Sequence, residues 1–353
     1  MKNERYIAYD IMRIIACFGV IMIHCAVFEQ EALYNYSTWE YQGIKLWGVL
    51  SRWAGPAFVM LSGMLVLPKA DEISIKRLFI HRVFRMLFAY IAWSCVYSFY
   101  NTYVLEKVYT TTKLKTFIDG CFSGEIHMWY LPMLGGLYLI SPILSIIVRN
   151  ASRKWSAFWI AGLMMFTSII PFIEFLNIKF VSVIVQSING YMDLQFLGGW
   201  TLYFVLGYYI GIHTFTKKER ILIYSISVVA LIFTFYFTII YCMVYGKARG
   251  VLSYEYPNIV LFSVGIMIFF KEEVSKLHFK NTTEKRIIGV SKLTFGIYLI
   301  HVLLLKVFYF WGINIQMFHP LLSVPLVAFA VFLSSGGIIW VVRKCPLIGK
   351  YLA

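Results

Sequence analysis

The sequence predicts an all-α, polytopic membrane protein with about ten transmembrane helices. Hydrophobic residues make up 60% of the 353-residue chain and charged residues only 14%, and the mean hydropathy is +0.73. Soluble globular domains do not have this composition. Apolar runs long enough to cross a bilayer recur along the whole sequence,. No stretch is polar enough to form a separate soluble domain, so we expect residues 1–353 to form a single membrane-embedded domain.

Ten spans follow from the apolar runs and from the polar breaks between them. Their expected positions are 6–28, 44–67, 83–104, 128–148, 155–173, 199–213, 221–243, 257–270, 287–310 and 321–342. The sixth and eighth spans are short, which is typical of helices that begin before their apolar run or that are broken beside a binding site. An even number of spans places both termini on the same side of the membrane.

The basic residues predict that this side is the cytoplasm. The net charge is +15, and most loop lysines and arginines fall in alternate segments, among them 69–85, 149–154, 271–286 and 343–350. Cytoplasmic loops of membrane proteins carry such an excess. Because the charge is spread over loops, nucleic acid is not an expected partner, and the expected environment is the lipid bilayer of a cell membrane. No feature of the sequence predicts an oligomeric state.

Several familiar chemical signatures are missing from the sequence. It contains no Walker loop, dinucleotide glycine fingerprint or nucleophile elbow,. The six cysteines show neither metal-ligand nor paired spacing, and most lie inside apolar runs, so we expect them to pack between helices without a disulfide framework or a metal,. An ATP-driven pump and a self-contained hydrolase are therefore disfavoured.

The first span carries three ionisable residues, Asp10, Arg13 and His24. Arg13 and His24 are eleven positions apart, which puts them on one helical face about 16.5 Å apart along the axis. Asp10 precedes Arg13 by three positions and can pair with it. An interfacial ion pair and a helix-to-helix hydrogen bond would each explain one part of this pattern. The shared helical face of Arg13 and His24 instead favours a functional pathway through the protein, because charged residues at membrane depth usually mark such a pathway.

The second span contains another charge, Arg52, followed by Pro56 and by the small-residue step Ser62-Gly63. We expect Pro56 to loosen the helix and to free backbone carbonyls at mid-depth. Arg52 lies too deep for easy contact with the headgroups. Ser62-Gly63 alone is more typical of close helix packing than of a ligand site.

A basic flank precedes the third span and includes Arg77, Arg82 and Arg85. Arg82 and Arg85 are three positions apart and share one helical face. Guanidinium groups at the inner surface suit an anionic phosphate ligand. Ordinary contact with lipid phosphates is the competing explanation for such a flank.

Polar and aromatic residues gather at the outer start of the fourth span. Glu125 and His127 are candidates for an acid/base or orienting pair, whereas Trp129 and Tyr130 are expected of an interfacial belt,. His301 lies past mid-depth in the ninth span, with the same two interpretations as His24,. The long outer loops at 105–127 and 174–198 are the expected surface for binding a substrate that would accept a transferred group.

Taken in order, these motifs resemble the acyltransferase-3 family of membrane acyltransferases. They are Asp10, Arg13 and His24, Arg52 to Gly63, Arg82-x-x-Arg85, His127-x-Trp129-Tyr130-Leu131, and Ser291 to His301. Each motif is weak alone, but the ordered set extends from residue 10 to residue 301. The resemblance implies a ten-helix unit that takes an acyl group, usually acetyl, from cytoplasmic acyl-CoA. It also implies a hydroxyl of an extracytoplasmic glycan or lipid-linked sugar as acceptor, and a bacterial cytoplasmic membrane as location.

The resemblance and the charge pattern together suggest roles for the residues. We expect Arg13, Arg77, Arg82 and Arg85, with Ser62, to bind acetyl-CoA, and we expect His24 to act as general base or as an acylated relay. Arg52 would stabilise the oxyanion and Asp10 would pair with Arg13. Acceptor contacts are expected from Glu125, His127, Trp129, Tyr130 and His301. The alternative is a small-solute transporter or flippase, for example an amino-acid carrier, that uses the same charged cavity without covalent chemistry.

Overall fold

The computed structural model describes residues 6–28, 35–72, 74–105, 113–176, 199–246 and 250–345, and all regular elements in these ranges are helical. The structure therefore confirms the all-α prediction for this part of the chain. Residues 1–5 and 346–353 lie outside the described ranges, so the cytoplasmic location of both termini stays a prediction.

The first half of the chain consists of helices joined by short 3-10 or π-helical segments, which are labelled η. These elements are α1 (Ile7–Phe28), α2 (Trp39–Leu50), α3 (Ala54–Val66), η2 (Leu67–Glu72), α4 (Ile75–Leu78), η3 (Phe79–Val83), α5 (Phe84–Phe99), η4 (Tyr100–Leu105), α6 (Lys113–Ser123) and α7 (Tyr130–Asn150). The expected outer loop at 105–127 thus contains a helix, α6, and the expected loop before residue 44 is helical from Trp39.

The second half continues in the same manner. Its elements are α8 (Arg153–Met164), η5 (Met165–Ile169), α9 (Ile170–Phe175), α11 (Trp200–Ile212), α12 (Lys217–Tyr245), α13 (Pro257–Glu272), η7 (Val274–Lys276), α14 (Asn281–Ser291), α15 (Thr294–Phe310) and α16 (Pro320–Val342). The expected outer loop at 174–198 falls almost entirely outside the described residues.

Each of the ten predicted spans coincides with helix, but not all of these helices are long. Within the described residues, seven helices are long and apolar enough to cross a membrane, or eight if the bent pair α14–α15 is one span. The predicted sixth and eighth spans correspond to α11 and α13, which have only 13 and 16 residues. A multi-pass architecture is therefore clear, and the count of ten stays a prediction.

Two of the predicted spans are interrupted. The second is divided at residues 51–53 into α2 and α3. Pro56 then falls in the first turn of α3, where its missing N–H leaves no intrahelical bond unmade,. The ninth span bends by 52° between α14 and α15.

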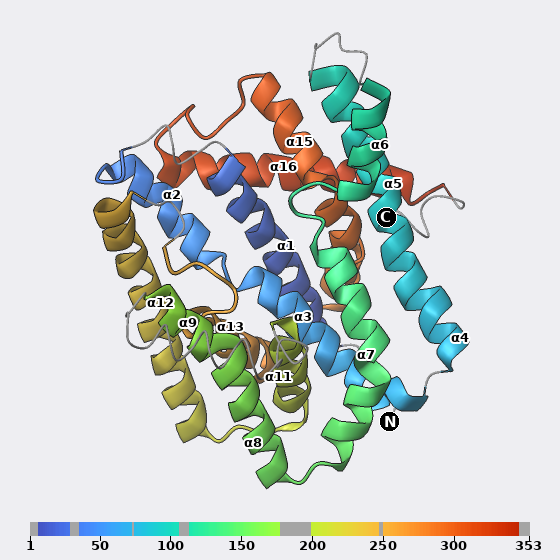
Figure 1. Cartoon of the computed structure of the whole chain (residues 1–353), viewed down its shortest axis with the longest axis vertical. Helices are drawn as coiled ribbons and strands as arrows, with labels where there is room; N and C mark the ends of the chain where they lie inside the picture. The colour runs from blue at the N-terminus through green and yellow to red at the C-terminus, as the bar shows by residue number, and fades with distance from the viewer. Residues whose placement is uncertain are drawn as a thin grey trace.

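Helix α1 lies inside the bundle and organises its neighbours (Figure 1). It packs against α2, α3, α13, α14, α15 and α16. In Figure 1, α12 lies on one side of it and α5 on the other. Asp10, Met12, Ala16 and Ile21 of α1 are fully buried or nearly so. Helix α1 is therefore a central helix of the bundle, and Asp10 of the predicted polar stripe is buried in protein.

Helices α3 and α11 pack with their backbones in contact. A Cβ at Gly63 would overlap the carbonyl oxygen of Phe204, and a Cβ at Gly207 would overlap the carbonyl oxygen of Met60. Only glycine allows two helices to approach this closely. The packing interpretation of Ser62-Gly63 therefore holds for Gly63.

Ion pairs and a hydrogen bond connect several of the predicted cytoplasmic segments to other parts of the chain. Arg149 pairs with Asp71 at 2.6 Å, and Arg220 pairs with Glu272 at 3.3 Å. Arg343 donates to the carbonyl of Lys292 at 2.6 Å. The first two bonds join segments that the charge pattern assigns to one side of the membrane, and the third joins such a segment to the start of the predicted ninth span.

Candidate functional site

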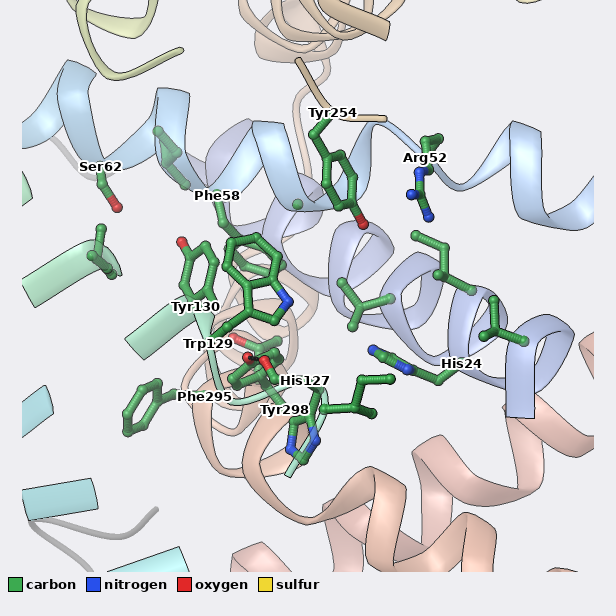
Figure 2. Close-up of a pocket in the computed structure, with 18 of the residues that line it drawn as sticks. His24, Arg52, Phe58, Ser62, His127, Trp129, Tyr130, Tyr254, Phe295 and Tyr298 are labelled. Carbon is green, nitrogen blue, oxygen red and sulfur yellow. Dashed lines mark hydrogen bonds between the residues drawn. The ribbon is translucent and has the colours of Figure 1, made fainter. Parts of the chain in front are cut away.

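A cavity of about 1380 Å³ is lined mainly by α1, α3, α5, α7 and α15, with the segment 250–256 contributing to its wall. Many of the predicted site residues line it, namely Arg13, His24, Arg52, Ser62, Arg85, Glu125, His127, Trp129 and Tyr130. Figure 2 shows Ser62 and Phe295 toward one end of the view and His24 with Arg52 toward the other. Arg13 and His24 both line the cavity from α1, so the predicted shared face is present.

One end of the cavity, the arginine end, is lined by Arg13 and Arg85, and Arg82 lies beside it. The Nη1 atom of Arg13 lies 3.1 Å from Oδ1 of Asp10, as predicted for the i, i+3 pair. Asp10 is fully buried, and its Oδ1 also accepts a bond of 2.6 Å from the Ser291 hydroxyl at the bend between α14 and α15. The side chain of Arg13, by contrast, is 29% exposed. Asp10 therefore anchors Arg13 without reaching the cavity itself.

Arg82 and Arg85 have buried nitrogen atoms without a hydrogen-bond partner. These atoms are Nη1 of Arg82 and Nε of Arg85, and among the described residues neither finds an acceptor. Their guanidinium groups lie over the rings of Tyr138 and Phe295, at 5.6 and 5.2 Å from the ring centres. The Tyr138 hydroxyl is within electrostatic reach of all three arginines of this end. Buried cationic donors of this kind are suited to an anionic ligand.

A local change in helix winding accompanies the two arginines. The segment η3, which contains Arg82, is π-helical, and such segments occur frequently at functional sites,. Arg77 lies before η3 in α4, is exposed and does not line the cavity. The structure thus brings Arg85 to the cavity and Arg82 beside it, but it leaves Arg77 at the surface.

The other end, the histidine end, brings together His24, His127 and His301. The ring centroids are 5.1 Å apart for His24 and His301, 4.9 Å for His127 and His301, and 5.9 Å for His24 and His127. The three rings come from α1, from the turn before α7 and from α15, respectively. His301 does not line the cavity, and its ring packs against both of the other rings. Proximity of His24 to His301 and His127 was not predicted from the sequence.

Burial affects the protonation of these rings. His127 lies in the turn between α6 and α7, outside the membrane-spanning helices, and is only 2% exposed. Burial lowers the pKa of its imidazole well below the ordinary value, and the neighbouring His301 and His24 act in the same direction,. A neutral imidazole has a lone pair that can accept a proton or a hydrogen bond.

Arg52 lies at the break between α2 and α3 and lines the cavity near His24 (Figure 2). Its Nε atom donates to the carbonyl of Leu252 at 2.6 Å, and its guanidinium group lies 4.2 Å from the centre of the Tyr254 ring. The break in the span therefore gives Arg52 backbone and aromatic partners in the segment 250–256. A charged group that is held in this way stays inside the cavity.

Glu125 lines the cavity but does not bond to His127 in the described structure. Its carboxylate accepts from Nζ of Lys306 at 2.6 Å and from Nδ2 of Asn101 at 3.2 Å. Lys306 also donates to Oδ1 of Asn101 at 2.8 Å. The predicted pairing of Glu125 with His127 is thus replaced by a network that fastens the turn of His127 to α15 and η4.

Aromatic rings cover the histidine end of the cavity. Trp129 and Tyr254 have ring centroids 6.2 Å apart, and Trp200 lies 5.1 Å from Trp129 and 5.2 Å from Tyr254. Tyr130 packs against Tyr298 at 5.7 Å. Trp129 and Tyr130 therefore belong to the cavity wall in addition to any role at the membrane interface.

Comparison with known protein families identifies the family of this chain. A family model described as an acyltransferase domain, acyltransferase-3, matches residues 6–343. The chain belongs to the acyltransferase-3 family. Comparison with curated proteins and with solved structures gives no match. The matched range contains every residue of the cavity described above, so the resemblance inferred from the ordered motifs is confirmed.

Membership of the acyltransferase-3 family implies acyltransferase activity, and the apolar helices make this acyltransferase-3 protein a multi-pass membrane protein. Its cavity combines cationic donors at one end with imidazoles at the other. No group of three or more potential metal ligands is arranged to hold an ion within the described ranges, although three imidazoles meet there.

Sequence reasoning missed several residues of this acyltransferase-3 site. Lys306 carried a usable signal, because it is a lysine inside an apolar run, five positions after His301. Tyr97, Asn101 and Tyr254 carried none, because they are uncharged and belong to no recognisable motif. Their contacts depend on how α5 and the segment 250–256 pack in three dimensions.

Proposed function

We propose that this acyltransferase-3 protein transfers an acetyl group from cytoplasmic acetyl-CoA to a hydroxyl of an extracytoplasmic or lipid-linked carbohydrate. The observation that carries the proposal is the arrangement of a single cavity. It has guanidinium groups with unpaired nitrogens at one end and a cluster of imidazoles at the other.

The arginine end has the chemistry that an acyl-CoA donor requires. Its nucleotide portion carries several phosphates, and arginine binds phosphate with directed, charge-assisted hydrogen bonds. Arg13 and His24 line the same cavity from one helix. Eleven residues of helix correspond to about 16.5 Å. A long pantetheine arm that follows this face would bring the thioester to His24.

The histidine end supports acyl transfer to a hydroxyl. We propose that His24 takes the proton of the acceptor hydroxyl while its oxygen attacks the thioester carbonyl carbon, a contribution that is typically about 10²–10⁴-fold. Arg52 would stabilise the negative oxygen of the tetrahedral intermediate. The C–S bond then breaks, and CoA leaves as the thiol with the proton from His24. In the alternative sequence, a ring nitrogen of His24 attacks the thioester carbonyl carbon, the C–S bond breaks and CoA leaves as the thiol. The acceptor hydroxyl then attacks the acetyl-imidazole, the C–N bond breaks, and the hydroxyl proton returns to the imidazole.

The acceptor is proposed to enter beside the aromatic wall. Trp129, Tyr254 and Trp200 present broad apolar ring faces, with Arg52 and Glu125 among the polar groups nearby. A sugar has both apolar C–H faces and hydroxyl edges, so it can use both kinds of surface. A bacterial envelope carbohydrate is the acceptor that fits this proposal.

The test is acetyl-CoA binding and CoA release by the detergent-purified protein. Wild type is compared with Arg13→Ala and His24→Ala, and His278→Ala, an exposed histidine outside the cavity, is the matched control. We expect Arg13→Ala to weaken binding, and His24→Ala to bind the donor but to release CoA at least about 10²-fold more slowly.

The absence of acetyl-CoA binding by folded wild-type protein would contradict the proposal. So would wild-type turnover by His24→Ala at equal protein amounts. A solute transporter or flippase would instead move labelled solute without acyl-CoA, and no observation here favours that alternative.

A further inference from the structure

We propose that His301 is a positioning residue for His24: its Nε2 atom accepts a hydrogen bond from the His24 imidazole and thereby turns the lone pair of His24 toward the cavity. The inference rests on the proposed function of His24, and it gives His301 a role other than contact with the acceptor. His301 is fully buried and does not line the cavity. It therefore acts through another group.

The hydrogen bonds of His301 determine which of its nitrogens is available. Its Nδ1 atom lies 2.6 Å from the carbonyl oxygen of Tyr298. A carbonyl oxygen only accepts, so Nδ1 carries the proton and, in the neutral ring, Nε2 carries the lone pair. The Nε2 atom is buried and has no hydrogen-bond partner among the described residues. A buried acceptor of this kind is costly unless a donor reaches it.

His24 is placed to be that donor. The two ring centroids are 5.1 Å apart, with the ring planes inclined by 54°. A hydrogen bond of about 3 Å between two imidazole nitrogens places their ring centroids roughly 5 Å apart. A small rotation of the half-buried His24 side chain is then enough to form the bond, and catalytic hydrogen bonds commonly tighten only when substrate is bound.

His127 is the competing donor, with its ring 4.9 Å from that of His301. Its plane is inclined by 74°, an edge-on contact in which an N–H tends to meet a ring face,. His24 also shares its helical face and the cavity with Arg13. His127 also lines the cavity, and neither of its ring nitrogens has a partner among the described residues. The choice of His24 therefore rests on the inclination of the rings, and the experiment below separates the two.

The turn of α15 that carries His301 is held on both sides. The Tyr97 hydroxyl donates to the carbonyl of Leu299 at 2.9 Å and accepts from the N–H of Leu303 at 3.0 Å. These are the two groups that an uninterrupted α-helix bonds to each other, and His301 lies midway between them. The Tyr298 hydroxyl donates to the carbonyl of His127. A side chain fixed by such supporting bonds is what positioning requires.

The chemical role of His301 would be that of the third residue of a catalytic triad, which orients the general base. Such a partner accepts the N–H of the base, fixes its tautomer and leaves the opposite nitrogen free for the substrate proton. In the proposed reaction the acceptor proton moves to His24 and then to the CoA thiolate. His301 exchanges no atom and contributes only the hydrogen bond.

The test combines His301→Leu and His301→Gln with His24→Ala in the full-length purified protein. Initial rates of CoA release are measured against acetyl-CoA concentration. We expect His301→Leu to lower kcat by about 10–100-fold with the KM for acetyl-CoA within about twofold of wild type. His301→Gln, whose amide oxygen can still accept, should recover a large part of this loss. His213→Gln, a histidine at the end of α11, is the control and should keep the wild-type rate.

A double-mutant cycle distinguishes positioning from a general structural effect. In the His24→Ala background, His301→Leu should cause no further loss of the residual rate. In a His127→Leu background, the full loss should persist. The inference is overturned if His301→Leu lowers the residual rate of His24→Ala by the same factor as in wild type, or if the coupling is to His127.

The proposed function and this inference fail in different ways. If wild type neither binds acetyl-CoA nor releases CoA, the proposed function is wrong and the inference falls with it. If wild type is active and His301→Leu matches it in kcat, only the positioning role is wrong.

Discussion

The two ends of the cavity differ in how their polar groups are bonded. At the arginine end, buried nitrogens of Arg82 and Arg85 have aromatic neighbours but no acceptor among the described residues. At the histidine end, Glu125 is bonded to Lys306 and Asn101, and further hydrogen bonds hold the backbone around His127 and His301. The arginine end thus has buried cationic donors of Arg82 and Arg85 without an acceptor among the described residues. The histidine end has a bonded network around Glu125, beside imidazole nitrogens of His127 and His301 that have no partner among the described residues.

From this difference we expect the arginine end to provide binding free energy for a ligand and the histidine end to position the reacting groups. Unpaired cationic donors gain most from an anionic ligand, because the ligand supplies the bonds that the protein leaves open. A network with satisfied bonds gains little from a ligand but can hold reacting groups in place. Substitutions at the arginine end should therefore change donor affinity, and substitutions at the histidine end should change turnover.

The largest effect is expected from breaking the network at Glu125. Lys306→Met leaves the Glu125 carboxylate largely buried without its cation, and loss of one partner of such a pair costs about 3–5 kcal/mol. We expect a clear fall in the thermal unfolding temperature in detergent, together with slower CoA release. The double variant Glu125→Gln/Lys306→Met should recover much of the stability. Equal stability of Lys306→Met and wild type would show that the network does not hold the histidine end together.

A smaller effect, confined to affinity, is expected at the arginine end. Arg85→Ala removes a donor with an open hydrogen bond, and a bond to a charged group contributes about 1.5–3 kcal/mol. The Kd for acetyl-CoA should therefore rise by roughly 10–150-fold, with kcat at saturating donor nearly unchanged. Titration by calorimetry measures this change.

Arg77→Ala is the matched control for Arg85→Ala, because Arg77 is an exposed arginine outside the cavity. It should leave the Kd for acetyl-CoA as in wild type. A loss of affinity with Arg77→Ala as large as that with Arg85→Ala would mean that the donor binds at the inner surface, outside the cavity.

The smallest effect is expected from Tyr97→Phe. This change removes only the hydroxyl that bridges Leu299 and Leu303, and a neutral hydrogen bond contributes about 1 kcal/mol,. CoA release should slow by about fivefold without a change in donor affinity. Tyr103→Phe, on the neighbouring segment and 44% exposed, should have no effect. If Tyr97→Phe weakens donor binding and spares turnover, the two ends are not functionally separate.

The sequence was sufficient to predict the helical class, the first-span face and nine of the residues that line the cavity. Long-range apolar periodicity and intramembrane charges are strong local signals, which is why Arg13, His24 and Arg52 were identified from sequence alone. The break in the second span was only partly anticipated. Pro56 indicated a loosened helix, whereas the structure ends α2 before Arg52 and begins α3 at Ala54.

The partners of the site residues could not be predicted in the same way. Glu125 bonds to Lys306, which is 181 positions away in the sequence, and His24 meets His301 from a different helix. Such contacts depend on helix rotation and tilt, and these follow from packing across the whole bundle. Charge and spacing alone also did not indicate that Arg77 lies exposed at the surface whereas Arg85 lines the cavity.

The glycine contact between α3 and α11 has a consequence for how the protein enters its membrane. Helix α11 has 13 residues and is about 20 Å long,. The hydrocarbon core is about 30 Å thick, so this segment cannot cross it as an independent unit. Gly63 and Gly207 let the two backbones touch, and α3 is synthesised more than a hundred residues earlier. Stable insertion of α11 should therefore wait for α3, which makes the early helices a template for the late ones during biogenesis.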